Sequence, residues 1–135
     1  MRQINFVPLK KFVAGAALLA LSACAPIVAP PGPVATTPVF SGDAFVTSDG
    51  LRLPARLWLP ADNRNRKFKA VVLAVHGFND YSKAFDKVPG ASGVGPFLAE
   101  NGIAVYAYDQ RGFGNAPHFG LWSGGDVMAR DFADF

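Results

Sequence analysis

The chain of 135 residues contains one cysteine, Cys24, which excludes any disulfide within it. Charge is also scarce, at 17% of residues, with a net charge of +3 at pH 7. The first 23 residues contain Arg2, Lys10 and Lys11 but no acidic residue, and the remainder has ten basic and ten acidic residues. The excess positive charge therefore belongs to the amino terminus alone. A neutral remainder gives no support to a role in nucleic-acid binding.

A long apolar run is also lacking. Residues 12–25 are apolar or small but number only 14 before Pro26, whereas a membrane-spanning helix needs about 20. Positive, apolar and then small residues follow one another in the order of a secretory signal peptide. A transmembrane anchor is the weaker alternative.

The segment Leu21-Ser22-Ala23-Cys24 resembles the lipobox of bacterial lipoproteins. The resemblance implies a signal peptide over residues 1–23, cleavage before Cys24, and lipid attachment to its thiol. We therefore expect attachment to a membrane of the cell envelope. Ala25, in place of an aspartate, favours the outer membrane where the sorting rule of that family applies. A chance cysteine in an ordinary signal peptide is the alternative.

Proline is concentrated just after Cys24. Residues 24–39 hold five prolines and no charged residue, a composition that indicates an extended tether rather than part of a core. We expect the folded domain to comprise residues 40–135. It starts with a β-prone segment at residues 44–47 and a turn at Ser48-Asp49-Gly50. Residues 51–59 alternate apolar and polar, which predicts a half-buried antiparallel strand, and Pro54 places that strand near a sheet edge.

Two unbroken apolar hexamers follow, Ala70–Val75 and Ile103–Tyr108. Runs of this kind predict strands buried on both faces. The 27 residues from His76 to Gly102 suffice for a helical crossover between parallel strands. We expect loops at residues 61–69 and 79–95, a helix at 96–101 that ends at Gly102, and a second helix from Asp126.

The polar turns after these hexamers carry the most specific motifs. His76-Gly77-Phe78-Asn79-Asp80-Tyr81 and Asp109-Gln110-Arg111-Gly112-Phe113-Gly114 resemble motifs of the α/β-hydrolase superfamily. Within it they look most like the monoacylglycerol lipase and lysophospholipase-like group, often classed with the serine aminopeptidase S33 domain. The resemblance covers residues 44–135. It implies an α/β fold with an antiparallel edge hairpin, then parallel strands with helical crossovers, truncated before the nucleophile elbow.

The resemblance also implies roles for the first turn. The backbone N–H of Phe78 would be one donor of an oxyanion hole, with His76 and Gly77 supporting the loop. A plain turn at the strand exit is the alternative. His76 and His118 are not expected to be the catalytic base, which comes late in such chains. Phe78, Asn79, Tyr81 and Phe85 could line a substrate pocket, and ordinary aromatic packing explains them equally well.

The second turn is expected to be structural. Asp109 can accept backbone N–H bonds and pair with Arg111, while Gly112 and Gly114 permit positive φ angles. A dinucleotide-binding loop is the alternative, but G-x-G is too short for that fingerprint. We expect no cofactor and no metal site.

A G-x-S-x-G motif is missing, since none of the six serines has glycines at the required spacing. By resemblance, the nucleophile elbow would follow roughly 20–30 residues beyond Phe135, and all three triad residues would lie outside this chain. We therefore expect the amino-terminal part of a serine hydrolase of carboxylic esters. The resemblance implies a lipid or lysophospholipid ester as substrate, and we expect this chain alone to be inactive and poorly folded. The alternatives are a non-catalytic envelope lipoprotein and a peptidase or thioesterase of the same superfamily. The oligomeric state stays open.

Overall fold

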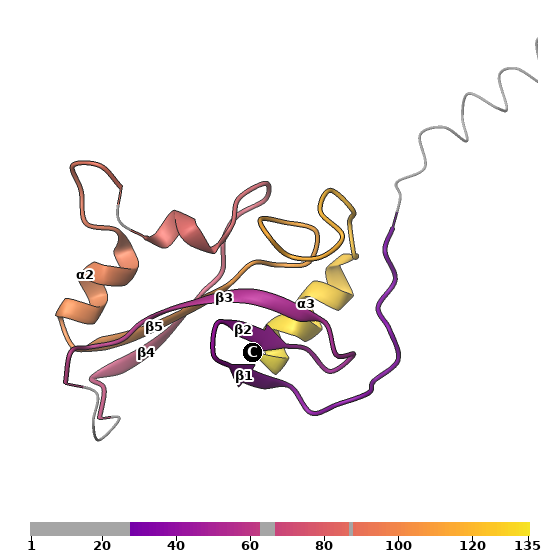
Figure 1. The fold of residues 1–135 in the computed structure, drawn as a ribbon, viewed down its shortest axis with the longest axis horizontal. Coiled ribbons are helices and arrows are strands. Elements are labelled where there is room, and N and C mark those ends of the chain that lie inside the picture. The colour runs from indigo at the N-terminus through magenta and orange to yellow at the C-terminus, as the bar shows by residue number, and fades with distance from the viewer. Residues whose placement is uncertain (1–27, 63–66, 87) are drawn as a thin grey trace, which may run out of the picture.

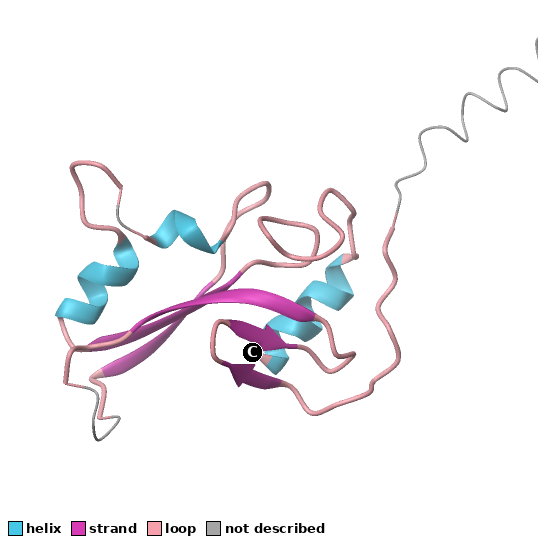
Figure 2. Ribbon diagram, in the orientation of Figure 1, coloured by secondary structure: helices cyan, strands magenta, loops and turns pink. Residues whose placement is uncertain are grey.

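A computed structural model describes residues 28–62, 67–86 and 88–135. The described chain forms one five-stranded sheet with short helices (Figures 1 and 2). The strands are β1 (Val39–Ser41), β2 (Ala44–Val46), β3 (Arg52–Trp58), β4 (Ala70–Ala74) and β5 (Ile103–Tyr108). The helices are the 3₁₀ helix η1 (Ser82–Phe85), α2 (Val94–Glu100) and α3 (Gly125–Asp134). The predicted signal peptide and Cys24 lie outside the described residues.

The strand order is β1-β2-β3-β5-β4. β1, β2 and β3 pair in antiparallel succession, and β3 also pairs antiparallel with β5. β4 and β5 are parallel, in a register that places Leu73 beside Tyr106. This arrangement confirms the predicted fold class, a partial α/β-hydrolase sheet with an antiparallel edge hairpin. The crossover from β4 to β5 contains η1 and α2, as the spacing predicted.

Aromatic side chains form the core where α3 meets the antiparallel strands. Phe45 and Tyr108 are almost completely buried and lie with their ring centroids 5.5 Å apart. Phe135, at the end of α3, contacts both rings at 5.1 and 4.6 Å. Leu53 and Ala116 complete this buried cluster. Burial of such rings is the largest apolar contribution that a small core can gain.

The two apolar hexamers differ in burial. β5 is buried as predicted, and Val105 is fully inaccessible to solvent. The prediction that Ala70–Val75 is buried on both faces is wrong for the described residues, because Val71 is 57% exposed and Leu73 44%. β4 lies at the end of the strand order with β5 as its one described neighbour. Sequence alone does not reveal which apolar strand is covered.

Pro54 does not mark an edge strand, contrary to the prediction, because β3 lies between β2 and β5. Ala55 pairs with Tyr108, the last residue of β5. The Pro54 carbonyl faces Asp109, the residue after Tyr108, and accepts a hydrogen bond of 2.8 Å from its backbone N–H. The proline nitrogen therefore faces the end of this ladder, where a missing donor disrupts little.

The predicted helices are present with shifted starts. α2 begins at Val94, two residues before Pro96, and Gly102 follows it with a φ of +87°, which suits its predicted role as the stop signal. α3 begins at Gly125, one residue before Asp126. The loop expected at 79–95 holds η1 and the first residues of α2. No helix among the described residues has the length and apolar character needed to cross a membrane.

The described part of the proline-rich segment lies against the domain. Val28 bridges to Trp122, and the Ala29 N–H donates to the Trp122 carbonyl at 3.2 Å. Further along, the Gly32 N–H donates to Asp49 Oδ2 at 2.9 Å, and the Ala35 and Thr36 N–H groups donate to the Ser48 carbonyl. Residues 28–36 therefore contact the folded domain at both ends of this segment. The domain boundaries at residues 23 and 39 stay predictions.

Candidate functional site

The loops that follow β4 and β5 meet at one edge of the sheet. Because the strands are parallel neighbours, their carboxyl ends point the same way, and open α/β sheets bind ligands at such ends. His76 follows β4 and Asp109-Gln110 follows β5. The two segments are joined by hydrogen bonds between His76 and Gln110. The structure thus brings together the two motifs that the sequence singled out.

His76 is buried and its imidazole is fully engaged. Nε2 accepts the backbone N–H of Gln110 at 3.0 Å, and Nδ1 lies 2.9 Å from the Gly77 carbonyl oxygen. The Gln110 side-chain nitrogen also lies 3.3 Å from Nδ1. The Gln110 amide completes the link by donating to the His76 carbonyl at 2.7 Å. A ring held on both nitrogens has no free site for proton transfer. Its observed contacts are those of a residue that fixes the loop.

Phe78 stands out from the loop that His76 fixes. Its side chain is 81% exposed, and its ring contacts Phe113 and Trp122 at centroid distances of 5.3 and 6.3 Å. The next residue, Asn79, has a φ of +60°, in the left-handed region that asparagine tolerates better than most residues. The chain therefore turns sharply at Asn79, shortly after β4 ends. The donor role of the Phe78 N–H stays a prediction.

Asp109 is the centre of the second loop. Its Oδ1 accepts the Ser82 N–H and its Oδ2 accepts the Asn115 N–H, both at 2.8 Å. Gly114, with a φ of +55°, passes so close that an added Cβ would lie 2.4 Å from Asp109 Oδ2. Gly112 also has a positive φ, of 78°. The conformations expected of both glycines and the backbone-binding role expected of Asp109 therefore match the structure.

The predicted pairing of Asp109 with Arg111 is not formed. Arg111 instead binds two other carboxylates, those of Asp49 and Asp131. Its two terminal nitrogens contact Asp49 at 2.7 and 2.6 Å, while Nε and one terminal nitrogen contact Asp131. The cause is geometric, because both oxygens of Asp109 already bind backbone N–H groups. Arg111 thus ties the β2–β3 turn to α3.

Charge pairing dominates the electrostatics of this cluster. Hydrogen bonds from Arg111 outweigh burial and hold the pKa of Asp49 far below its usual range. Burial acts to lower the pKa of Arg111, but its bonds to Asp49 and Asp131 prevail and raise it. Burial, reinforced by the charge of Asp131, raises the pKa of the Tyr108 phenol. These groups keep one charge state at neutral pH, as expected of a scaffold and not of an acid–base catalyst.

Two pockets lie beside the loops. The first, of about 270 Å³, is lined by Phe78, Asn79, Gly112, Phe113, Phe119, Gly120, Leu121 and Trp122. The second, of about 450 Å³, has a more polar lining that includes Arg56, Asp80, Lys83 and Asn115. Asn79 borders both pockets, while Tyr81 borders the second only. Phe85 lines neither of them, so it is not brought to the candidate site.

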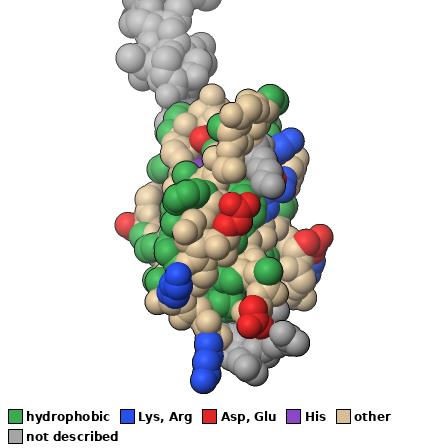
Figure 3. Space-filling view, turned by 90° about the vertical axis from the view of Figure 1, so that its left-hand side faces the viewer, with side chains coloured by type: hydrophobic (Ala, Val, Ile, Leu, Met, Phe, Trp, Pro, Cys, Tyr) green, Lys and Arg blue, Asp and Glu red, His purple; other side chains and the backbone are tan. Residues whose placement is uncertain are grey.

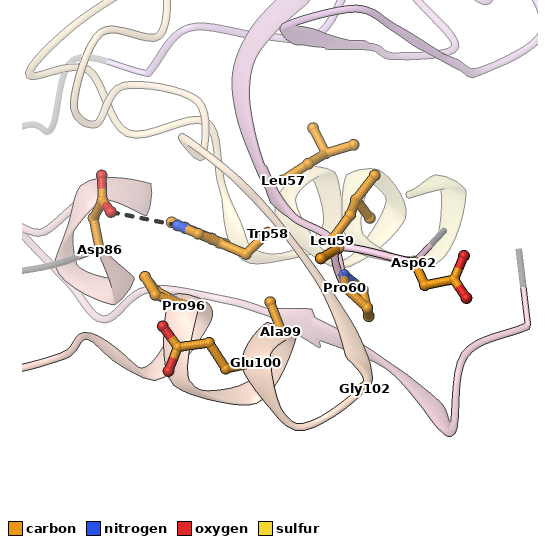
Figure 4. Close-up of a pocket in the computed structure, with 11 residues that line it drawn as sticks. Leu57, Trp58, Leu59, Pro60, Asp62, Asp86, Pro96, Ala99, Glu100 and Gly102 are labelled. Atoms are coloured by element: carbon orange, nitrogen blue, oxygen red, sulfur yellow. Dashed lines mark hydrogen bonds between the residues drawn. The ribbon is translucent and has the colours of Figure 1, made fainter. Parts of the chain in front are cut away.

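A larger cavity lies elsewhere. Its volume is about 810 Å³, and Figure 4 shows Trp58, Pro60, Pro96 and Ala99 around it. The Trp58 indole N–H donates to Asp86 at 3.4 Å across one side. Gly102, which precedes β5, also lines it, so this cavity lies at the amino end of β5. It is at the opposite end of the sheet from both motif loops, and we do not assign the chemistry to it.

Sequence reasoning missed the aromatic residues of the second loop. Phe119 is 74% exposed and Trp122 40%. The sequence pattern that could have predicted them is a group of three aromatic residues, Phe113, Phe119 and Trp122. They lie within a glycine-rich stretch that is too polar to be a core strand. His118, also in this stretch, is exposed and has a φ of +63°. Within the described residues, no group of three or more metal-ligating side chains is placed to hold a metal ion.

Comparison with known proteins yields three findings. The family model of the serine aminopeptidase S33 matches residues 66–135, just over half of the chain. A serine hydrolase-like protein of Dictyostelium discoideum is 33% identical over 73 residues, which are 54% of this chain and 17% of that protein. The crystal structure of a hypothetical protein from Pseudomonas aeruginosa is similar with a TM-score of 0.53 and 21% identity.

The structural match covers 76% of this chain and 30% of the other, and at this identity it shows a shared fold only. The chain thus spans less than a third of the length of each of these two proteins. The family match includes both motif loops, because it runs from residue 66 to residue 135.

Proposed function

Because the chain belongs to the serine aminopeptidase S33 family of the α/β-hydrolase superfamily, we propose that it supplies the oxyanion loop and part of the acyl pocket of a serine hydrolase of carboxylic esters. The observation that carries this proposal is the juxtaposition at the end of the sheet. A loop fixed by His76 presents Phe78 beside a small pocket with an aromatic lining.

The chemistry follows from the position of this loop. When a serine attacks an ester carbonyl, the carbonyl oxygen gains negative charge, and preorganised N–H donors stabilise it. The hydrogen bonds of His76 restrain the His76–Phe78 backbone, so a donor there would need little reorganisation during the reaction. Loss of one such donor typically lowers kcat by a factor of about 100 to 1000.

The position of β4 at the edge of the described sheet leaves room for a neighbouring strand that carries the nucleophile. β4 lies at the end of the strand order among the described residues. A strand added parallel to β4 would end beside the His76–Phe78 loop, where a nucleophile must lie to share a substrate with it. We therefore propose that the catalytic serine comes from sequence outside residues 1–135.

Lipid esters are the proposed substrate class. The pocket of about 270 Å³ borders on Phe78, Phe113, Phe119, Leu121 and Trp122, and none of the described residues that line it is charged. Such a lining favours an acyl chain over the charged amino terminus of a peptide. The proposed lipid attachment at Cys24 would keep the protein close to such substrates. Either a monoacylglycerol or a lysophospholipid would fit this description.

The test uses the product of the complete reading frame, identified by sequencing the source DNA past codon 135. The purified protein is assayed with p-nitrophenyl esters of increasing acyl length, a lysophospholipid, a thioester and aminoacyl p-nitroanilides. We expect ester hydrolysis that increases with acyl length, and fluorophosphonate labelling of a serine beyond residue 135.

Preferential cleavage of the aminoacyl anilides would replace the ester proposal with the peptidase alternative. Preference for the thioester would favour the thioesterase branch. A product that neither hydrolyses any substrate nor reacts with the fluorophosphonate would favour the non-catalytic alternative. Labelling with radioactive palmitate, compared between the wild type and C24S, tests the lipid anchor separately.

A further inference from the structure

Two consecutive residues after β5 hold both ends of the loop that follows β4. Asp109 Oδ1 accepts the Ser82 N–H at 2.8 Å, while Gln110 binds His76. Residues 77–81 lie between these two attachments, and Figure 1 shows the loops after β4 and β5 next to each other. We call the set of His76, Ser82, Asp109 and Gln110 the loop clamp. All four of its members are described residues.

Gln110 binds His76 with both its backbone and its side chain. The Gln110 N–H donates to His76 Nε2 at 3.0 Å. The side-chain amide of Gln110 donates to the His76 carbonyl at 2.7 Å, and its nitrogen also lies 3.3 Å from Nδ1. A carbonyl lies in one peptide plane with the N–H of the next residue. The Gln110 side chain therefore sets the orientation of the peptide that joins His76 to Gly77.

Gly77 makes this restraint necessary. Glycine has access to more backbone conformations than any other residue, and a Cβ built on Gly77 would have no described atom within 4 Å. Packing of the described residues therefore does not fix the Gly77 dihedral angles. Because Phe78 comes next, any change of those angles redirects the Phe78 N–H. The hydrogen bond from the Gln110 side chain holds the peptide just before this flexible residue.

From this geometry we propose that Gln110 is a positioning residue for ester hydrolysis, because its side-chain amide holds the peptide that directs the Phe78 N–H toward the oxyanion. The inference rests on the proposed function, in which that N–H is a donor of the oxyanion hole. Gln110 lines neither of the two pockets beside the loops, so its effect passes through His76.

A positioning role predicts a specific kinetic effect. An aligned N–H donor binds the carbonyl oxygen more strongly in the transition state, where that oxygen is negatively charged, than in the bound ester. Loss of the alignment therefore lowers kcat and leaves KM nearly unchanged. A misplacement of about 1 Å lowers the rate by a factor of about 100.

The test compares Q110E with N101D in the product of the complete reading frame. Q110E keeps the shape of the side chain but places a carboxylate oxygen, which cannot donate, against the His76 carbonyl. N101D makes the same exchange after α2, where the Asn101 side-chain amide donates to the Phe97 carbonyl at 2.8 Å. Steady-state kinetics use a water-soluble short-chain p-nitrophenyl ester. We expect Q110E to lower kcat about 100-fold with KM unchanged, and N101D to change neither.

The control position tolerates an added charge. Asn101 is exposed and precedes β5, so it lies at the opposite end of the sheet from the loop clamp. Figure 3 views the side of the molecule that carries α2 and shows charged side chains exposed among hydrophobic ones there. Substitutions at such surface positions generally have small effects on stability. N101D therefore reports what the loss of an amide donor does away from the site.

Q110M gives a second variant that introduces no charge beside His76. We expect it to lower kcat about tenfold or more, again without a change in KM. Amide hydrogen exchange of Q110M, resolved for single residues, adds a measurement that involves no reaction. The backbone N–H of residue 110 should exchange several-fold faster than in the wild type, because its partner His76 is less firmly held. The Ser82 N–H should be unchanged, since Asp109 still accepts it.

The other outcomes overturn the inference. A raised KM at unchanged kcat means that Gln110 contributes to substrate binding instead. Equal losses of kcat in Q110E and N101D mean a general effect of losing an amide donor. Equally faster exchange at residue 110 and Ser82 means a general loosening of the fold. Wild-type kcat in folded Q110M means that the clamp does not position the donor.

The kinetics also distinguish this inference from the proposed function. If the wild-type product hydrolyses no ester, the proposed function fails, and the positioning role fails with it. If the wild type hydrolyses the ester and both Gln110 variants match its kcat, only the inference about Gln110 fails.

Discussion

At the scale of single residues, Arg111 has the most demanding environment. It lies buried between two carboxylates that are 62 and 20 positions away in sequence. A guanidinium group can satisfy both because it presents several donors in one plane. The spacing Asp109-x-Arg111 suggested a local partner, but the sequence does not show that backbone N–H groups occupy Asp109. Those donors, from Ser82 and Asn115, come from distant loops, which sequence spacing does not reveal.

The first prediction concerns this buried charge cluster. Replacing Arg111 with methionine leaves the Asp49 and Asp131 carboxylates buried without their partner. We expect R111M to lower the free energy of unfolding by about 3–5 kcal/mol. R52M is the control, because Arg52 pairs with Asp43 at 3.5 Å on an exposed surface, and its loss should cost less than about 1 kcal/mol. Urea denaturation of both variants checks the difference, and equal losses would contradict the structural role of Arg111.

The second prediction concerns acid stability. The pKa of Asp49 is lower in the folded protein than in the unfolded chain, where it is near 3.9. Its contribution to stability is therefore complete above the unfolded pKa and is lost as pH falls toward the folded one. We expect the wild-type urea midpoint to fall between pH 5 and pH 3, with a smaller fall in D49N. The comparison uses the slope of the midpoint against pH, since we expect D49N to be less stable than the wild type throughout this pH range. Parallel slopes would show that Asp49 is not the responsible group.

At the scale of elements, the sequence predicted β5 and its burial but misjudged β4. Both hexamers have the unbroken apolar pattern of a buried strand. Burial, however, depends on which neighbours cover a strand. β5 is flanked by β3 and β4, and α2 packs against it. β4 has no described strand on its other side. Pro54 likewise led to the wrong prediction that β3 lies near an edge of the sheet. A proline in the sequence shows that one backbone donor is missing, but it does not show where the hydrogen-bond ladder ends.

The third prediction concerns the loop after β5. Gly112 and Gly120 have almost the same φ, 78° and 80°, but different surroundings. A Cβ at Gly112 would lie 2.2 Å from the Leu121 carbonyl oxygen, whereas one at Gly120 would have no described atom within 4 Å. G120A should cost only the strain of a left-handed backbone, about 1–2 kcal/mol. G112A adds a backbone clash, and we expect a clearly larger loss of thermal stability. Similar melting temperatures for the two variants would contradict this geometry.

At the scale of the whole molecule, Asp49 connects the proline-rich segment to the core. It accepts the Gly32 N–H with the carboxylate that binds Arg111. The described residues thus form one continuous set of contacts from Val28 through the β2–β3 turn to α3. Composition predicted an extended tether but could not predict that the domain holds its described residues 28–36. That contact depends on Trp122 and Asp49, which tertiary folding alone places within reach.

The fourth prediction tests this connection by hydrogen exchange. D49A removes the acceptor of the Gly32 N–H and one partner of Arg111, so amides of residues 28–36 should exchange faster than in the wild type. D43A is the control, since Asp43 is exposed and lies outside the segment's contacts. Exchange rates are followed by mass spectrometry of peptides from this segment. Unchanged protection in D49A would show that the segment is held by the Trp122 and Ser48 contacts alone.

The strand order β1-β2-β3-β5-β4 has a consequence for how the chain is made. The second edge of β3 stays unpaired until β5 is made, and β4 leaves the ribosome before β5, its one described partner, is available. At translation rates of about 5–20 residues per second, the interval between Ala74 and Ile103 lasts a few seconds. During that time a five-residue apolar segment has no place in a sheet. We therefore expect chaperones to bind the nascent chain at this stage. The yield of native protein should then depend on the supply of chaperones during synthesis.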